Sequence, residues 1–168
     1  VIVVDMDELL YPIKDFRSEN SDNKTTSKAS VSEAMYYSLE YLHNEGVIIP
    51  ITQGFNMYCD NFPYNYNKPL TEQVKYGVRS PDFDKLVVFS PKHVQEINYE
   101  YGCHKCRPIL KDGTDCKFLY QSPPDLKLLH YKYLGAKYLT ERHRMYAERM
   151  STFNKTAAKY NGAGYEYL

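Results

Sequence analysis

The chain has 168 residues, of which 43% are hydrophobic and 25% charged, so it can bury one hydrophobic core. Two independent domains would each be small. Its 21 basic and 21 acidic residues balance, so no net field draws it toward nucleic acid, and we expect no nucleic-acid partner. Four cysteines are too few for a disulfide scaffold, and the apolar runs fall short of the roughly 20 residues of a transmembrane helix. We therefore expect a cytoplasmic protein without a transmembrane segment, either free or at the inner face of the membrane.

The first four residues, Val1 to Val4, are apolar and β-branched, which predicts a central strand covered on both faces. This run ends in the acidic cluster Asp5-Met6-Asp7-Glu8. Open α/β sheets bind ligands at the carboxyl ends of their strands, so we expect a site at these carboxylates. Because a core strand begins at the first residue with no signal peptide before it, we also expect the chain to be a fragment or a processed product.

The spacing Asp5-x-Asp7 indicates a metal site. Alternate residues of an extended backbone point to the same side, so both carboxylates can reach one hard divalent cation, Mn²⁺ or Mg²⁺. Such a cation would neutralise a diphosphate leaving group. Two solvated turn carboxylates show the same bare pattern, and its place directly after the apolar run is what favours a site.

A polar loop is expected up to Ser30, where Ser30 and Glu33 match a capping box. Hydrophobic residues at helical spacing follow, and Gly46 supplies a stop, which together predict a helix from about Val31 to Asn44.

Two strands are expected after this helix. Val47 to Ile51 is a short candidate whose Pro50 limits pairing on one side, and Leu86 to Phe89 is a stronger one. The stretch between them is rich in Asn, Tyr and Pro and is expected to form either a long ordered loop or a hairpin.

The last predicted elements are a strand from Asp125 to Tyr131 and a helix from Ala136 to about Asn154. The helix carries Arg142, Arg144, Arg149 and His143, but interleaved Glu141 and Glu148 favour a solvated, salt-bridged face over a phosphate or nucleic-acid surface. Arg142 is the exception, because it would lie near the end of the preceding strand if the helix packs back over the sheet.

The pair Cys103-x-x-Cys106 raises the question of a structural zinc site. Four ligands would require His104 and Cys116 as well, and an adjacent Cys and His rarely reach one ion together. Ordinary loop thiols are the favoured interpretation.

One reaction class with paired aspartates is the haloacid-dehalogenase type of phosphatase, in which Asp5 would be the nucleophile and Asp7 the general acid. The segment Ile51 to Gly54 resembles the second, hydroxyl-bearing motif of that family. Position 9 is Leu where the family usually has Thr or Val, and no later acidic motif completes its magnesium site. Phosphatase activity therefore remains the alternative function.

A broader resemblance is carried by six segments in order: Val3 to Glu8, Thr52 to Met57, Lys85 to Phe89, Glu96 to Tyr99, Gly102 to His104 and Leu128 to Leu134. Together they resemble the second half of bacterial family-2-like glycosyltransferases of the GT-A fold, over nearly the whole chain up to Gly164-Tyr165-Glu166-Tyr167. The family's amino-terminal βαβ region, which binds the nucleotide base, would precede Val1.

The resemblance implies roles for particular residues: Asp5 and Asp7 hold the metal and donor, His130 completes the coordination, and His104 lines the acceptor cleft. For His130 a bond to a backbone carbonyl is the alternative. Lys132 would meet a phosphate oxygen and Glu8 would support the ligands. Asp125 and Asp60 are candidates for a catalytic base.

These observations predict a single α/β domain over residues 1–168, a partial GT-A-like mixed sheet flanked by helices. The expected activity is metal-dependent transfer of a sugar from a nucleotide-diphosphate donor to a glycan or other hydroxyl acceptor. A non-catalytic carbohydrate-binding remnant is the third hypothesis, beside the transferase and the phosphatase.

Overall fold

The computed structural model describes residues 1–12, 30–63, 65–100, 103–113 and 126–151, with side chains described up to residue 148. It confirms a mixed α/β fold with a mixed sheet flanked by helices. The chain divides into two compact units, residues 1–56 with 78–130 and residues 57–77 with 131–168. The prediction of one domain over residues 1–168 stays a prediction.

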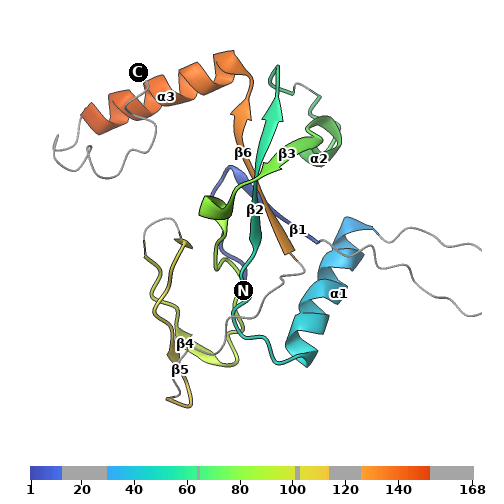
Figure 1. Ribbon diagram of the computed structural model, residues 1–168, viewed down its shortest axis with the longest axis vertical. Helices are drawn as coiled ribbons and strands as arrows, with labels where there is room; N and C mark the ends of the chain where they lie inside the picture. Colours follow the sequence, from blue (N-terminus) through green and yellow to red (C-terminus); the bar gives the residue numbers. More distant parts are fainter. Residues whose placement is uncertain (13–29, 64, 101–102, 114–125, 152–168) are drawn as a thin grey trace, which may run out of the picture. The chain divides into compact units, whose positions relative to one another are not determined.

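The main sheet has four strands in the order β1-β6-β2-β3, and a second sheet pairs β4 with β5 (Figure 1). β1 runs antiparallel to β6, with Glu8 opposite His130. The strands are β1 (Glu8–Pro12), β2 (Gln53–Cys59), β3 (Tyr76–Arg79), β4 (Val94–Glu96), β5 (Ile109–Leu110) and β6 (Leu126–Leu134). The helices are α1 (Val31–Asn44), α2 (Leu70–Gln73) and α3 (Ala136–Ser151), with a short 3-10 turn, η1, at Pro81–Phe83.

The capping box predicted for α1 is present. The Ser30 hydroxyl accepts a hydrogen bond from the Glu33 N–H at 3.3 Å, and the Glu33 carboxylate accepts one from the Ser30 N–H at 2.7 Å. The two side chains thus satisfy backbone donors that the first helical turn leaves without partners. The helix ends at Asn44, as predicted, and Gly46 follows it with φ +71°.

The prediction of a buried central strand at Val1 to Val4 is wrong. These residues are 38–55% exposed, and the segment forms one isolated bridge, between Ile2 and Val88. Its hydrogen bonds run to residues 87–89, with the Val3 N–H donating to the Val87 carbonyl at 2.8 Å. The described part of the chain packs no second layer over this segment, so an apolar run alone did not decide its burial.

Two further strand predictions need correction. Val47 to Ile51 forms bends, and the strand begins only at Gln53, beyond Pro50. Leu86 to Phe89 is buried at its centre but forms no ladder, because its backbone bonds go to different segments, such as Leu86 N–H to the Cys103 carbonyl at 3.2 Å. The Asn-, Tyr- and Pro-rich stretch between them contains β2, α2, β3 and η1 rather than a single loop.

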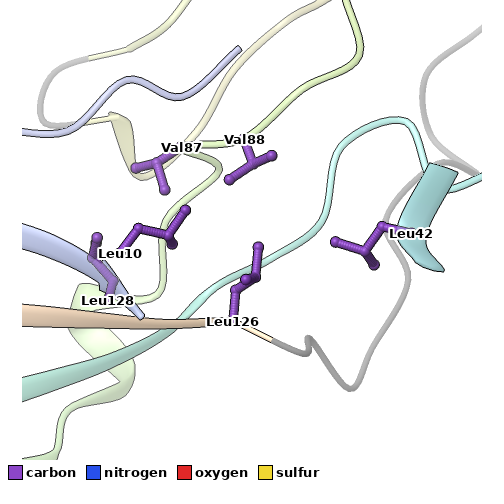
Figure 2. Close-up of a cluster of buried hydrophobic side chains, with 6 residues drawn as sticks. All are labelled: Leu10, Leu42, Val87, Val88, Leu126 and Leu128. Carbon is purple, nitrogen blue, oxygen red and sulfur yellow. The ribbon is translucent and has the colours of Figure 1, made fainter. Parts of the chain in front are cut away.

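The main core cluster lies between the sheet, α1 and the extended segment at Val87. Its side chains come from β1, α1, residues 87–88 and β6, and Figure 2 shows them converging. The members are Leu10, Leu42, Val87, Val88, Leu126 and Leu128. Full burial of each such side chain contributes about 1.5–3 kcal/mol, so this cluster supplies much of the stability of the strand that carries His130.

The predicted strand and helix near the C-terminus are present, and β6 continues to Leu134, beyond the predicted end at Tyr131. β6 begins at Leu126, since Asp125 lies outside the described residues, and α3 is described up to Ser151. Arg144 and Glu148 form the expected salt bridge at 2.6 Å on an exposed face. Within the described ranges, none of the helices combines the length and apolar character that crossing a bilayer requires.

Candidate functional site

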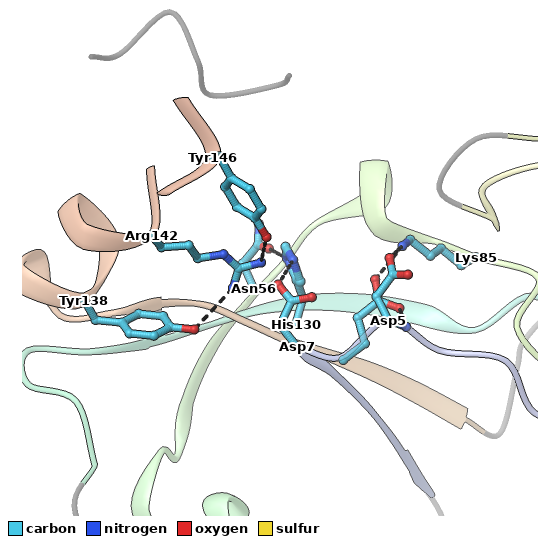
Figure 3. A network of polar contacts seen from close by, with 9 residues as sticks. Asp5, Asp7, Asn56, Lys85, His130, Tyr138, Arg142 and Tyr146 are labelled. Carbon is cyan, nitrogen blue, oxygen red and sulfur yellow. Dashed lines mark hydrogen bonds and ion pairs between the residues drawn. The ribbon is translucent and has the colours of Figure 1, made fainter. Parts of the chain in front are cut away.

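The acidic cluster forms a tight turn that leads into β1. The Glu8 N–H donates to the Asp5 carbonyl at 3.0 Å, and the Asp5 N–H donates to Glu8 Oε2 at 3.1 Å. The carboxylates therefore precede a strand instead of following a buried one. Because the backbone turns here, Asp5 and Asp7 contact different partners (Figure 3).

Asp7 contacts His130. Asp7 Oδ2 lies 3.1 Å from His130 Nε2, and both side chains are largely buried, at 17% and 8% exposure. The other ring nitrogen, Nδ1, lies 2.9 Å from Asn56 Oδ1, an acceptor to which Nδ1–H donates. This bond directs Nε2 toward the Asp7 carboxylate, which is the orientation a metal-binding histidine takes when its second nitrogen is held by a carbonyl.

Asp5 contacts Lys85 instead. Its Oδ2 lies 3.3 Å from Lys85 Nζ, and the same ammonium makes a short contact with the Glu8 carboxylate. Burial by itself would lower the pKa of Lys85, but the hydrogen bond and charge of Glu8, followed by those of Asp5, outweigh it and raise that pKa. Lys85 is therefore a charged lysine in the interior, neutralised by the acidic turn.

A phenylalanine ring covers one side of His130. The Phe83 and His130 rings are stacked with their centroids 4.2 Å apart, and the Phe83 ring is also 6.0 Å from that of His104. Phe83 reaches this position because η1 packs directly on Gly54 of β2, where an added Cβ would collide with the Phe83 backbone. Asp84 fixes the turn further by accepting the Gly54 N–H at 2.8 Å.

The residues predicted for the site are brought together only in part. Asp7 and His130 form a pair, whereas Asp5 lies with Lys85 and Glu8. Within the described residues, no three His, Cys, Asp or Glu side chains surround a common point. Of the three predicted metal ligands, Asp7 and His130 are thus in contact, while Asp5 contacts Lys85 instead.

The other residues predicted for the site are His104, Lys132, Asp125 and Asp60. His104 is exposed and reaches Phe83, Lys132 is in β6 with its ammonium 5.7 Å from the Tyr133 ring centroid, and Asp125 lies outside the described residues. Asp60 directly follows β2, and its charge contributes to the raised pKa of Cys59, after burial of that thiol. The roles proposed for these residues remain predictions.

The cysteines give no support to a zinc site among the described residues. Cys103 is partly buried, and burial raises the pKa of its thiol, with Lys85 opposing that change. Cys106 belongs to the second buried cluster, beside Ile49 and Leu86, while Cys116 lies outside the described residues. Ordinary thiols remain the favoured interpretation.

Three residues of the site were not predicted from sequence: Lys85, Asn56 and Phe83. A signal existed for Lys85, because a lysine directly before Leu86 to Phe89 is adjacent to a buried run, and buried lysines require a charged partner. Asn56 and Phe83 carry no comparable signal, since each acts through a contact that forms only in the folded chain.

No protein-family model, no curated protein and no solved structure matches the chain. The likeness to family-2-like glycosyltransferases therefore rests on the six sequence segments, and the activity it implies stays a prediction. The geometry of the Asp7 and His130 pair is the structural observation that bears on it most directly.

Proposed function

We propose that the chain is the metal- and acceptor-binding part of a glycosyltransferase, which moves a sugar from a nucleotide-diphosphate donor to a glycan or other hydroxyl acceptor. The observation that supports this function is the contact between Asp7 Oδ2 and His130 Nε2 at 3.1 Å. The spacing of the acidic cluster predicts Asp7 as a metal ligand and the family resemblance predicts His130, although the two residues are far apart in the sequence.

The pair suits a divalent cation. With Nδ1–H donated to Asn56, Nε2 is the ring nitrogen that faces Asp7 and would be the one to bind a cation. The 3.1 Å between Asp7 Oδ2 and His130 Nε2 is short enough for both atoms to reach one divalent cation. An imidazole ligand favours Mn²⁺ over Mg²⁺, so Mn²⁺ is the cation proposed first.

The charges of the site agree with this assignment. Asp5, Asp7 and Glu8 contribute three negative charges and Lys85 one positive charge, which leaves −2 with a neutral His130. A divalent cation would neutralise this sum. The remaining coordination positions would be filled by water and donor phosphates, as is common where only one or two protein groups hold the ion.

A divalent cation bound there would supply positive charge to stabilise a nucleotide-diphosphate leaving group. Asp7 and His130 would hold the metal and Glu8 would support the turn, while contact of Lys132 with a phosphate oxygen stays a prediction from the sequence. If the anomeric carbon is inverted, the acceptor hydroxyl needs a carboxylate base to take its proton, and Asp125 and Asp60 remain the candidates from the sequence.

Phosphatase activity is the second candidate, because Lys85 lies beside Asp5 and an ammonium next to a nucleophilic carboxylate would attract a phosphate. The position of Lys85 argues against it. Its side chain is 4% exposed and already contacts two carboxylates, which leaves little room for a phosphate oxygen. Glycosyl transfer is therefore the better-supported proposal.

Titration with Mn²⁺, followed by the electron paramagnetic resonance signal of the free ion, tests the metal site. Wild type is expected to bind Mn²⁺, and Asp7→Asn and His130→Ala are each expected to weaken binding at least about tenfold, or about 1.4 kcal/mol. Asp82→Asn and His43→Ala, which alter exposed side chains of the same unit, serve as matched controls and should bind like wild type.

A wild-type chain that takes up no Mn²⁺ contradicts the proposal. If the metal site is present, Mn²⁺-dependent release of nucleoside diphosphate from a panel of nucleotide sugars tests the reaction itself. Hydrolysis of a generic aryl phosphate that is lost in Asp5→Asn would instead favour the phosphatase. Glycan binding that resists chelators would favour a non-catalytic module.

A further inference from the structure

The segment Val1 to Val4 is hydrogen-bonded along one edge. The Val3 N–H donates to the Val87 carbonyl at 2.8 Å, and the Phe89 N–H donates to the Val1 carbonyl at 3.1 Å. These two bonds flank one residue of each segment, which is the pattern of an antiparallel strand pair. Because Val87 is fully buried, this edge of the segment is held against the core.

The opposite edge carries backbone groups that no described residue satisfies. In an antiparallel pair, successive residues direct their N–H and C=O groups to opposite edges. Val1 and Val3 bond inward, so the groups of the two alternate residues point outward. Within the described ranges, neither Ile2 nor Val4 donates or accepts a backbone hydrogen bond. Such an edge is a template for one further strand, which supplies donors and acceptors at the same spacing.

The side chains beside this open edge are those of a core strand. All four are apolar and β-branched, and they remain 38–55% exposed. Proteins commonly protect an exposed edge with lysine or proline, and the segment contains neither. Apolar side chains and outward amide groups thus face solvent together. This combination favours a polypeptide strand as the occupant, because a lipid surface offers no backbone groups at strand spacing.

We propose that this edge is a dimer interface, in which Val1 to Val4 pairs antiparallel with the same segment of a second copy of the chain. The edge is self-complementary. With Val3 opposite Val3 on a two-fold axis, Ile2 lies opposite Val4 of the second copy. Each such pair exchanges N–H···O bonds in both directions, so the outward groups of both copies are satisfied. A ladder this short buries little area, so the dimer is weak and forms only at high concentration.

Sedimentation velocity of the full chain, from micromolar to millimolar concentration, tests whether the dimer forms. Amide hydrogen exchange followed by NMR at both ends of this range tests which edge is involved. The Val4 N–H should exchange at least about threefold more slowly at high concentration, where the second copy accepts it. The Val3 N–H already donates to Val87 and should change little, so it is the internal reference.

Two variants separate strand pairing from a loose apolar contact. Val4→Lys adds a charge beside the edge, and Ile2→Pro removes an outward N–H but none of the bonds to residues 87–89. Each is expected to weaken dimerisation at least about tenfold. Val31→Lys is the matched control, because the Val31 side chain is 48% exposed and lies on α1; it should dimerise like wild type. Circular dichroism shows whether each variant keeps the fold.

A wild type that stays monomeric up to millimolar concentration overturns the inference, and so does a dimer that forms equally well in Val4→Lys. A dimer weakened by Val4→Lys but not by Ile2→Pro overturns the paired strands, because apolar contact alone would then hold it. A monomeric wild type that binds vesicles of phosphatidylcholine and phosphatidylserine would assign the segment to a lipid surface instead. None of these outcomes involves Mn²⁺, so this inference and the proposed function can each fail without the other.

Discussion

The proposed cation site joins two segments that both carry large hydrophobic residues but differ in environment. Val1 to Val4, which leads into the acidic turn, is 38–55% exposed, whereas β6, which carries His130, lies between β1 and β2. Val1 to Val4 is entirely apolar, whereas β6 also contains Lys127, His130 and Lys132. The number of hydrogen-bonded neighbours and packed layers, rather than apolar content, separates them. The site thus combines one ligand on a buried strand with carboxylates on an exposed turn.

The largest expected effect tests this contrast directly. Leu128→Ala in β6 removes a fully buried side chain and should lower the free energy of unfolding by about 2–5 kcal/mol. Val3→Ala removes fewer atoms from an exposed segment and should cost less than about 1 kcal/mol. Urea denaturation followed by circular dichroism measures both. Similar costs at the two positions would show that the first segment is as well packed as β6.

A smaller effect is expected at Gly54, in the strand next to β6. Gly54→Ala places a methyl group against the Phe83 backbone and should cost about 1–3 kcal/mol, because η1 must shift. The shift should move the Phe83 ring away from His130, which is detected by NMR as a change in the imidazole proton resonances. Phe83→Leu is the companion variant, which should change those resonances with no steric conflict at position 54. Unchanged stability and resonances in Gly54→Ala would contradict this account.

The smallest effect concerns alkaline pH and the acidic turn. The pKa of Lys85 is raised in the folded chain, so the unfolded chain loses this proton first as the pH rises. The stabilisation is complete below the usual lysine pKa of 10.5 and is lost as the pH passes the higher folded value. The stability of wild type should therefore fall more steeply above pH 10.5 than that of the Lys85→Met, Glu8→Gln variant. Thermal unfolding across this range measures the difference, and parallel curves would contradict it.

Local signals in the sequence predicted α1, the start of α3 and most of β6, but not α2. The capping box at Ser30 and the stop at Gly46 are short-range patterns, and α1 has the predicted bounds. Val1 to Val4 and Val47 to Ile51 were misjudged because strand formation depends on a partner that is distant in sequence. At Leu86 to Phe89 the burial was expected, but the division of backbone bonds among several segments has no local signature.

The sequence predicted the identity of the site residues better than it predicted their contacts. The sequence singled out Asp7 and His130, which are in contact, and also Asp5, which contacts Lys85. The expectation that both aspartates point to one side assumed an extended backbone, and the turn from Asp5 to Glu8 breaks that assumption. A tight turn within an acidic cluster depends on Glu8 reaching Lys85, a contact between residues 77 positions apart.

The interior position of β6 has a consequence for the motion of the ligand it carries. Both edges of the strand are hydrogen-bonded to neighbours, so its amide hydrogens exchange with solvent only when β1 or β2 separates from it. His130 therefore belongs to a segment that opens rarely, and its imidazole keeps its place while the outer strands fray. A cation bound by His130 would therefore keep this ligand in place while its other ligands move.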